Sequence, residues 1–309
     1  MKLLVTGAFN CSNEQLNTLK ALGNEILFLQ NEKDELPKDF LDAEGIIGNE
    51  IFLYHDIKQF ENLRYIQLTS AGFDRVPMDY IKAHGIEIHN ARGVYSIPMA
   101  EFAISGILQI YKQSRHFYDN QKNHIWNKNR NLFELFGKNV CIFGCGSVGN
   151  ECAKRLSAFG TKIFGVDIKP CENSNFEKMV TIDTCDEILG ISDIVILCLP
   201  LTEKTEFFFN KDRFSKMKTG SIFVNISRGQ IVETDSLISA LNSKLIGAVL
   251  DVFETEPLEE NSPLWDMDNV IITPHNSFVG EGNSNRLFNV IKSNLQRFYG
   301  GYNGEKAFN

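Results

Sequence analysis

The stretch Asn139-Val140-Cys141-Ile142-Phe143-Gly144-Cys145-Gly146-Ser147-Val148-Gly149 decides the fold of this chain. It begins with an apolar run that predicts a buried strand, and it continues with the spacing G-x-G-x-x-G. In that spacing Gly144 allows a tight turn, Gly146 lets the backbone approach a pyrophosphate, and Gly149 lets the following helix pack closely on the strand. The amino end of that helix offers N–H groups and a positive dipole to phosphates. The stretch therefore predicts a strand–turn–helix unit that binds a dinucleotide.

A second strand-like run, Lys162–Val166, ends at Asp167, at about the 20-residue offset where a carboxylate accepts hydrogen bonds from the adenosine ribose. The same carboxylate would repel a 2′-phosphate. We therefore expect NAD as the cofactor, with NADP as the less favoured alternative that Lys169 keeps open. A simpler interpretation is a chance glycine-rich turn with Asp167 as a helix cap. The ordered succession of strand, turn, helix, strand and acid favours the dinucleotide.

Short apolar runs alternate with helical patterns along almost the whole chain. Several runs are apolar at consecutive positions, which is typical of parallel strands covered on both faces. A length of 309 residues and so many strands exceed one ordinary sheet, so we expect two α/β domains. The runs are Leu3–Thr6, Glu25–Leu29, Gly45–Gly48, Tyr65–Thr69, Ile86–His89, Asn139–Phe143, Lys162–Val166, Ile194–Cys198, Ser221–Asn225, Ile246–Leu250 and Val270–Ile272.

The predicted boundary between the domains lies near Pro98. After it, Met99–Phe117 has the pattern of one long helix, with the proline in a favoured starting position. The expected architecture is two Rossmann-like, doubly wound parallel-sheet lobes with a cleft between them. Residues 1–98 with 281–309 would form the substrate-binding lobe, and residues 99–280 the NAD-binding lobe.

The composition limits the class of partner. The chain has 31 Lys+Arg against 39 Asp+Glu, a formal charge of −8, and 43% hydrophobic residues. The hydrophobic share excludes a disordered chain. The acidic balance argues against nucleic acid, whose binding begins with clustered Lys and Arg, but it allows a small anion in a local pocket. No apolar stretch approaches the ~20 residues that span a bilayer. We expect neither a nucleic-acid partner nor a membrane partner.

The seven cysteines are irregularly spaced, and no C-x-x-C pair occurs, so neither a disulfide framework nor a zinc site is predicted. Most lie in apolar runs, where cysteine behaves as a small hydrophobe. The amino-terminal residues enter a strand-like run at once, without the apolar region of a secretory signal. We expect reduced thiols and a cytoplasmic protein.

Polar residues follow several predicted strands at their carboxyl ends, where ligands bind in such sheets. They include Arg228, His275 and three carboxylates, Asp251, Glu254 and Glu256. Hydride transfer to a ketone needs a proton donor, which histidine supplies near neutral pH with a carboxylate beside it. A guanidinium binds a substrate carboxylate in bidentate fashion. Arginine, histidine and glutamate are thus the groups that reduction of a 2-oxo acid requires.

Each of these residues also has an ordinary structural interpretation. A lone histidine before a loop usually fills a turn, and an Arg-Gly pair at a strand end is often a simple turn. The Glu254–Glu256 segment before Pro257 could be a solvated acidic loop. From these residues alone, the chain is an NAD-binding enzyme whose reaction is open.

Further segments, in order along the chain, resemble the D-isomer-specific 2-hydroxyacid dehydrogenase family, which includes phosphoglycerate, glycerate and D-lactate dehydrogenases. The resemblance covers nearly the whole chain and implies an NAD-dependent oxidoreductase that interconverts a 2-hydroxy acid and a 2-oxo acid. The matching segments are Ser70-Ala71-Gly72-Phe73-Asp74, Ala100-Glu101, Gly137-Lys138-Asn139-Val140, Leu199-Pro200-Leu201-Thr202, Asn225-Ile226-Ser227-Arg228-Gly229, Asp251-Val252-Phe253-Glu254-Thr255-Glu256-Pro257 and Thr273-Pro274-His275.

The resemblance assigns roles residue by residue. It makes Arg228 the residue that orients the substrate, His275 the general acid/base, and Glu256 the partner that keeps the imidazolium populated. Glu254 competes with Glu256, but the family places its glutamate directly before the proline. The implied cofactor contacts are Gly144, Gly146, Ser147, Val148, Gly149, Asp167, Leu199, Pro200, Ile226, Ser227, Arg228, Asp251 and His275, with Asp251 on the nicotinamide carboxamide. The implied substrate contacts are Asn49, Ser70, Ala71 and Gly72 through their backbone amides, with Arg228 and His275.

The resemblance also implies a homodimer through the cofactor lobe, with Met99–Arg130 as the expected contact. Two departures from the family pattern concern the pocket. The loop Gly48–Tyr54 carries no Arg or Lys, which disfavours a phosphorylated substrate. The residues after His275, Asn276-Ser277-Phe278-Val279, are bulkier than the small residues that usually follow.

Two other functions remain open from the sequence. One is an NAD-sensing interaction protein, like the corepressors that resemble this family, without physiological turnover. The other is a nucleotide-sugar or methyl-transfer enzyme on the same fold, which would not require the arginine, glutamate and histidine in this order.

Overall fold

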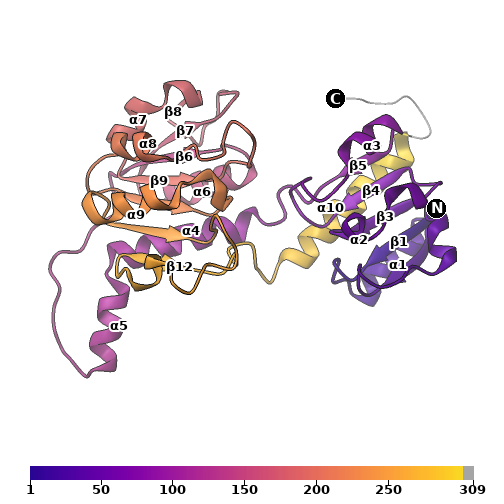
Figure 1. The fold of residues 1–309 in the computed structure, drawn as a ribbon, viewed down its shortest axis with the longest axis horizontal. Helices are drawn as coiled ribbons and strands as arrows, with labels where there is room; N and C mark the ends of the chain where they lie inside the picture. The colour runs from indigo at the N-terminus through magenta and orange to yellow at the C-terminus, as the bar shows by residue number, and fades with distance from the viewer. Residues whose placement is uncertain (302–309) are drawn as a thin grey trace. The chain divides into compact units, whose positions relative to one another are not determined.

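A computed structural model describes residues 1–301. The chain divides into two compact units, one formed by Met1–Tyr95 with the residues from Gly280 onward, and the other by Ser96–Val279. Each contains one sheet, and all neighbouring strands within the sheets are parallel. Figure 1 shows helices packed against both sheets. The expectation of two doubly wound parallel sheets is confirmed.

The first unit has the strand order β2-β1-β3-β4-β5, the flavodoxin-like arrangement. Its strands are β1 (Lys2–Thr6), β2 (Glu25–Leu29), β3 (Gly45–Gly48), β4 (Tyr65–Leu68) and β5 (Glu87–His89). Its helices are α1 (Asn13–Ala21), α2 (Ile51–Tyr54), α3 (Met78–Ala83) and α10 (Asn283–Gly301). In β1, Leu3, Leu4 and Val5 are all fully buried and divide between the two core clusters of the unit, as expected of a strand covered on both faces.

The second unit has the order β12-β11-β10-β9-β6-β7-β8, the classic dinucleotide-binding order extended by one strand. Its strands are β6 (Asn139–Phe143), β7 (Lys162–Val166), β8 (Lys178–Val180), β9 (Ile194–Leu197), β10 (Ile222–Asn225), β11 (Gly247–Leu250) and β12 (Val270–Ile272). Its helices are α4 (Ser96–Tyr111), α5 (Ser114–Lys122), α6 (Ser147–Ser157), α7 (Asp186–Ile191), α8 (Lys211–Lys216) and α9 (Thr234–Ser243). The order reverses at β6, which lies between β7 and β9, and ligands bind at the carboxyl ends of strands at such a reversal.

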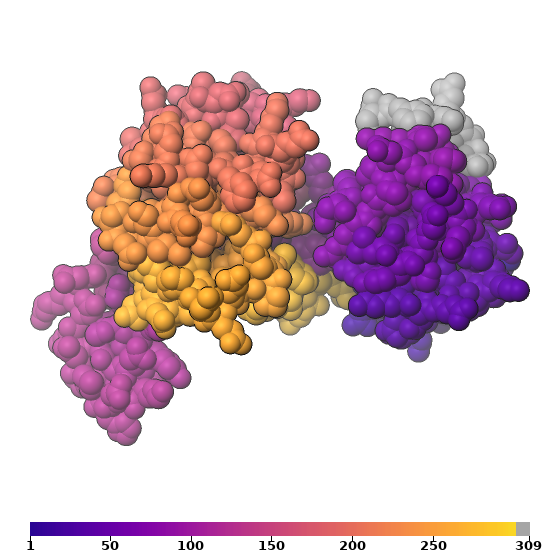
Figure 2. Space-filling view, in the orientation of Figure 1, coloured from indigo at the N-terminus to yellow at the C-terminus, as the bar shows by residue number. Residues whose placement is uncertain are grey.

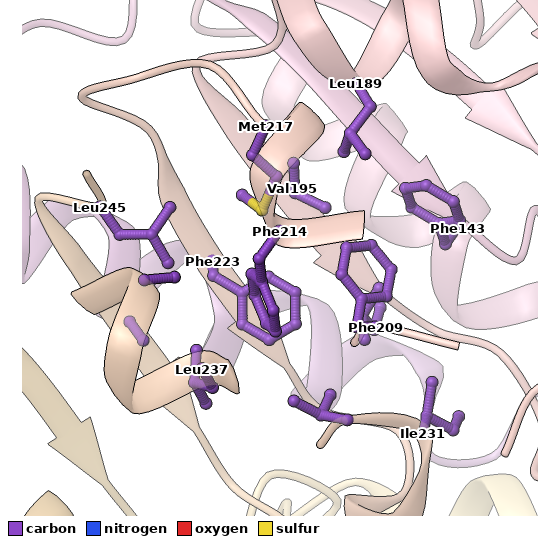
Figure 3. Packing of buried hydrophobic residues seen from close by; sticks show 14 of the residues in the cluster. Phe143, Leu189, Val195, Phe209, Phe214, Met217, Phe223, Ile231, Leu237 and Leu245 are labelled. Carbon is purple, nitrogen blue, oxygen red and sulfur yellow. The ribbon is translucent and has the colours of Figure 1, made fainter. Parts of the chain in front are cut away.

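Two cores hold the second sheet rigid. On one face, aromatic rings pack around Phe209, which is tilted against Phe223 at a centroid distance of 5.1 Å and meets Phe214 edge to face at 5.6 Å (Figure 3). On the other face α4 lies against the sheet so closely that a Cβ on Gly106 would come within 2.6 Å of Val249. These layers place the polar strand ends on a fixed support.

The sequence-based prediction is wrong in two places. The second sheet has seven strands rather than six, because β8 is a three-residue edge strand with an exposed first residue and shows no apolar run. The expected single helix over Met99–Phe117 is broken into α4 and α5 at Gln113, whose φ of 53° is left-handed. That break turns α5 and the segment after it away from the body of the second unit, as Figure 1 shows. Within residues 1–301, no helix is long and apolar enough to cross a membrane.

Candidate active site

The glycine-rich turn joins β6 to α6 and has room for a phosphate group. A Cβ on Gly144 would come within 2.6 Å of the Cys198 carbonyl oxygen, and one on Gly149 within 2.1 Å of the Gly144 carbonyl oxygen. Both glycines therefore allow close backbone packing. A Cβ on Gly146 would meet nothing within 4 Å, so the turn is open on that side. Gly146 is the N-cap of α6, and no side chain caps that end. The first N–H groups of α6, from Ser147 and Val148, thus form an end suited to a pyrophosphate.

Asp167 follows β7 and lies beside this turn. Its Oδ2 accepts a hydrogen bond of 2.8 Å from the Cys145 amide, and its Oδ1 accepts one of 3.4 Å from the Lys169 amide. Burial, with Asp167 nearby, raises the pKa of the Cys145 thiol to about 12, so this thiol is protonated at neutral pH. The carboxylate is therefore held by the same turn that would contact the phosphates, in the position that a ribose-binding acid requires. These residues fit a dinucleotide.

Arg228 lies in the loop after β10, which Asn225 organises. Asn225 is buried; its Oδ1 accepts hydrogen bonds from the amide and hydroxyl of Ser227, and its Nδ2 donates to the Arg228 carbonyl at 3.1 Å. A Cβ on Gly229 would come within 1.8 Å of the Phe253 carbonyl oxygen, so only glycine lets the loops after β10 and β11 touch. The Arg228 loop is thus packed directly on the loop that carries Glu256.

His275 and Glu256 form a hydrogen-bonded pair, with His275 Nδ1 2.8 Å from Glu256 Oε2. Glu256 Oε1 also accepts a hydrogen bond of 3.1 Å from the Phe253 amide, which fixes the carboxylate. The side chains of His275 and Glu256 are 41% and 37% exposed, so a substrate can reach them. With Nδ1 facing the carboxylate, Nε2 is the ring nitrogen left to exchange a proton with a substrate oxygen.

Glu254 has a different place. Its Oε1 accepts a hydrogen bond from the Thr234 amide at the start of α9. A carboxylate there accepts a hydrogen bond from a helix-terminal N–H and is stabilised by the positive end of the helix dipole. The structure therefore brings Glu256, and not Glu254, to His275.

Asp251 is fully buried at the end of β11 and holds the loop that carries His275. Its Oδ1 accepts hydrogen bonds of 2.7 Å from the Thr273 hydroxyl and from the Asn276 amide, and its Oδ2 accepts one of 2.9 Å from the Ser277 amide. Its own carbonyl accepts the His275 amide at 2.8 Å. His275 itself has a φ of 50°, a strained value for a histidine. The Asp251 carboxylate, which is predicted to contact the nicotinamide carboxamide, thus already accepts three hydrogen bonds from the protein.

The remaining residues of the predicted cofactor set lie at neighbouring strand ends of the second unit. Leu199 and Pro200 follow β9, and the Pro200 carbonyl accepts a hydrogen bond of 2.7 Å from the Thr205 hydroxyl. Ile226 and Ser227 follow β10 and are buried. All of these residues therefore belong to one edge of one sheet.

In the first unit, the amides expected to bind a substrate carboxylate differ in their partners. The amides of Asn49 and Glu50 donate to the carboxylate of Glu32 at 2.7 and 2.6 Å, so an internal anion already occupies them. The Ala71 and Gly72 amides have no hydrogen-bond acceptor within residues 1–301. The Ser70–Gly72 loop, after β4, is therefore the part of this unit that has amides to offer to an anion.

Three supporting residues escaped the sequence analysis: Asn225, Thr273 as a donor to Asp251, and Glu32 as an internal anion. Asn225 and Thr273 lie at strand ends, inside segments that resemble the family, and this position is the signal that could have identified them. The contact between Glu32 and Asn49 joins residues that no local pattern links.

A doubly wound sheet with an open glycine-rich turn, a carboxylate beside that turn and a histidine–glutamate pair at its carboxyl edge is typical of nicotinamide-dependent dehydrogenases. Comparison with known proteins makes the class specific. The family model for "D-isomer specific 2-hydroxyacid dehydrogenase, NAD binding domain" matches residues 104–277. The chain belongs to the D-isomer-specific 2-hydroxyacid dehydrogenase family and is an NAD-dependent oxidoreductase of that class.

Individual relatives agree with this assignment. The chain is 30% identical to a hydroxypyruvate reductase of Blautia hydrogenotrophica over 97% of this chain and 98% of that protein. It is similar to the structure of a D-isomer-specific 2-hydroxyacid dehydrogenase family protein from Aeromonas salmonicida, with a TM-score of 0.82, 28% identity and coverage of 97% and 95% of the two chains. It is also similar to D-lactate dehydrogenase from Aquifex aeolicus complexed with NAD and lactic acid, with a TM-score of 0.77, 26% identity and coverage of 97% of each chain.

The Asp251 network predicts a stability effect that can be measured. Asp251→Asn turns one acceptor oxygen into an NH2 group that faces a donor, so the free energy of unfolding should fall by about 2–4 kcal/mol. Urea denaturation followed by fluorescence measures this loss. Asp235→Asn, in the first turn of α9, is the control and should change stability by less than about 0.5 kcal/mol. Equal stability of Asp251→Asn and the native protein would show that the carboxylate network is not needed.

Proposed function

We propose that Arg228, Glu256 and His275 carry out the reduction of a small, unphosphorylated 2-oxo acid to its D-2-hydroxy acid. The observation that supports this most is the His275–Glu256 pair at 2.8 Å, on an exposed edge next to the Arg228 loop. The hydroxypyruvate reductase among the relatives acts on a small 2-oxo acid of this kind. No observation favours a purely NAD-sensing role over turnover.

The proposed roles follow from the chemistry of the side chains. When bound, NADH supplies the hydride. The Arg228 guanidinium binds the substrate carboxylate and polarises the neighbouring carbonyl. His275 Nε2 donates the proton that the developing alkoxide needs, and Glu256 stabilises the imidazolium through Nδ1. In the first unit, the Ser70–Gly72 amides are the groups proposed for substrate binding. Residues 1–98 with 281–309 would then be the substrate lobe, and residues 99–280 the cofactor lobe.

The test is NADH oxidation at 340 nm with a panel of glyoxylate, hydroxypyruvate, pyruvate, 2-oxoisocaproate, phenylpyruvate and 3-phosphohydroxypyruvate. We expect turnover of a small unphosphorylated member. His275→Ala should lower kcat by about 10²–10⁴, the usual contribution of a general acid. Glu256→Gln should lower kcat by roughly tenfold to a hundredfold, because the pair is more than a third exposed and screened by water.

His84→Ala serves as the control, since His84 is an exposed histidine at the carboxyl end of α3 in the first unit. It should keep the native kcat. Titration calorimetry with NADH should show unchanged cofactor affinity in Glu256→Gln. The proposal is wrong if the native protein binds NADH but reduces no acid of the panel.

We also propose that the enzyme prefers NAD to NADP, because the Asp167 carboxylate would repel a 2′-phosphate. The native kcat/KM should be at least about tenfold higher with NADH than with NADPH. Asp167→Ser keeps an acceptor for the Cys145 amide and removes the charge, so this ratio should fall towards one. Lys169→Ala is the matched control and should keep the ratio above one. Equal use of both cofactors by the native protein would contradict the assignment.

A homodimer formed through Met99–Arg130 is the proposed assembly. Beyond the break at Gln113, this segment exposes apolar side chains, including Trp126 at 97% and Tyr118 at 65%, and it projects from the second unit in Figure 2. A cluster of exposed apolar residues on a soluble protein marks a contact surface. The same unit has a groove of about 790 Å³ between α4 and α6, lined by Ile104, Leu108 and Phe159 among others, which a second copy could fill.

Sedimentation velocity tests this assembly. The native protein should sediment as a dimer at micromolar concentration, and Trp126→Glu should shift it towards monomer by placing a charge in an apolar contact. Ile191→Glu, at an exposed position outside the segment, is the control and should remain dimeric. A monomeric native protein would contradict the proposal.

We place the enzyme in the cytoplasm, which is consistent with seven cysteines that all remain free thiols.

A further inference from the structure

The amides of Ala71 and Gly72, which have no acceptor within residues 1–301, are oriented through their own peptide groups. A trans peptide group is planar, so the carbonyl of one residue and the N–H of the next lie in one plane and point in opposite directions. The direction of the Ala71 N–H therefore follows that of the Ser70 carbonyl, and the direction of the Gly72 N–H follows that of the Ala71 carbonyl. The partners of these two carbonyls decide where the amides point.

Both carbonyls accept hydrogen bonds from the segment that follows β5. The Ala91 amide donates to the Ser70 carbonyl at 2.8 Å. The Asn90 side chain donates through Nδ2 to the Ala71 carbonyl at 2.6 Å. Each of the two amides is thus aimed by a donor on the far side of its own peptide plane, and for one of them that donor is a side chain.

The segment that supplies these donors is itself fixed in the first unit. Ala91 and Val94 are buried in the same core cluster as the apolar face of α10. The Arg286 Nε, on α10, donates to the Val94 carbonyl at 2.7 Å. The Tyr95 hydroxyl donates to the Thr69 carbonyl, which extends the contact between the segment and the loop by one residue. The donors therefore act from a rigid support.

The Asn90 side chain has one orientation that satisfies both of its ends. Its Oδ1 accepts a hydrogen bond of 3.2 Å from the Arg92 amide, while its Nδ2 faces the Ala71 carbonyl. Rotating the side-chain amide by half a turn would place oxygen against oxygen and nitrogen against nitrogen. An asparagine at this position thus joins a donor of its own segment to an acceptor of the loop.

We propose that Asn90 is a positioning residue for substrate binding, and that it acts through the Ala71 carbonyl to aim the Gly72 amide. The inference rests on the proposed function, in which the Ser70–Gly72 amides bind the substrate. A hydrogen bond to the carbonyl also polarises the N–H of the same peptide group, which makes the amide a stronger donor. Reduction leaves the substrate carboxylate unchanged, so a weaker contact with it should raise KM more than it lowers kcat.

The test is steady-state reduction of hydroxypyruvate by NADH in the full-length native protein and in two variants. Asn90→Ala removes the side-chain amide, and Asn90→Leu keeps its approximate size without a donor. Both should raise the KM for hydroxypyruvate at least about fivefold, in line with a weakened charged hydrogen bond, and keep kcat within about threefold. The KM for NADH should not change. Where the native protein reduces another acid of the panel better, that acid replaces hydroxypyruvate.

Asn24→Ala is the matched control, because Asn24 makes the same kind of bond elsewhere in the first unit. Asn24 is buried, and its Nδ2 donates to the Leu19 carbonyl at 2.9 Å. It lies directly before β2, at the opposite edge of the parallel sheet from the Ser70–Gly72 loop. This variant should unfold at a lower urea concentration than the native protein but keep the KM for hydroxypyruvate within about twofold. The pair of variants thus separates positioning from stability.

The inference is overturned if Asn90→Ala keeps the native KM, if its kcat falls while KM stays unchanged, or if Asn24→Ala raises KM as much. Failure of the proposed function has a different signature, since the native protein would then bind NADH and reduce no acid of the panel. In that case titration of the NADH complex with oxamate, an amide analogue of pyruvate that is not reduced, replaces KM. Absent binding, or equal affinity of the native protein and Asn90→Ala, would then overturn the inference.

Discussion

The buried carboxylate of Asp251 is the interaction on which the geometry of the site depends. A charge without exposure to water costs several kcal/mol unless donors surround it. Here the donors are the Thr273 hydroxyl and the amides of Asn276 and Ser277, on both sides of His275. These three donors reach the carboxylate together when the loop from Thr273 to Ser277 has the conformation seen here. The loop therefore keeps His275 at a φ of 50°, where its ring meets Glu256, because relaxing it would leave the charge unpaired.

Parallel strands in register bring these groups together. Leu250 pairs with Asn225 on one side and with Ile272 on the other, so the three strands end at the same level. The residues that follow, in the Arg228, Asp251 and Thr273 segments, must therefore meet at one edge. The buried layers on both faces of the sheet prevent this edge from shifting, and each loop needs only local hydrogen bonds to aim its side chain.

The sequence predicts well those features whose cause is local. Strands buried on both faces are apolar at consecutive positions, and the glycine-rich turn has a fixed spacing. The sequence therefore predicts both the buried strands and the turn. Strand β8 is short and partly exposed, and it pairs with β7 at the edge of the sheet, a contact that no local pattern in the sequence indicates. The helix break at Gln113 could not be predicted from the sequence either, because a glutamine side chain does not favour a left-handed φ. Glu254 and Glu256 are two residues apart and equivalent by pattern, and only tertiary contacts to Thr234 and His275 distinguish them.

The two units show how two doubly wound parallel sheets support different uses. In the second unit, the turn after β6 is open at Gly146, and Asp167 holds it from the side. In the first unit, the turn after β1 is closed. The third residue after β1, where the second unit has Gly146 after β6, is Phe9, and it is buried with only 1% of its surface exposed.

The acid near the end of the second strand of the first unit, Glu32, then turns inward to the amides of Asn49 and Glu50, which follow the third strand. An internal carboxylate thereby takes amides that could otherwise bind an external anion, whereas the Ala71 and Gly72 amides after the fourth strand have no acceptor within residues 1–301. Doubly wound topology places every one of these strand ends at the same edge. Which end binds a ligand is decided by whether a side chain of the protein has already filled it.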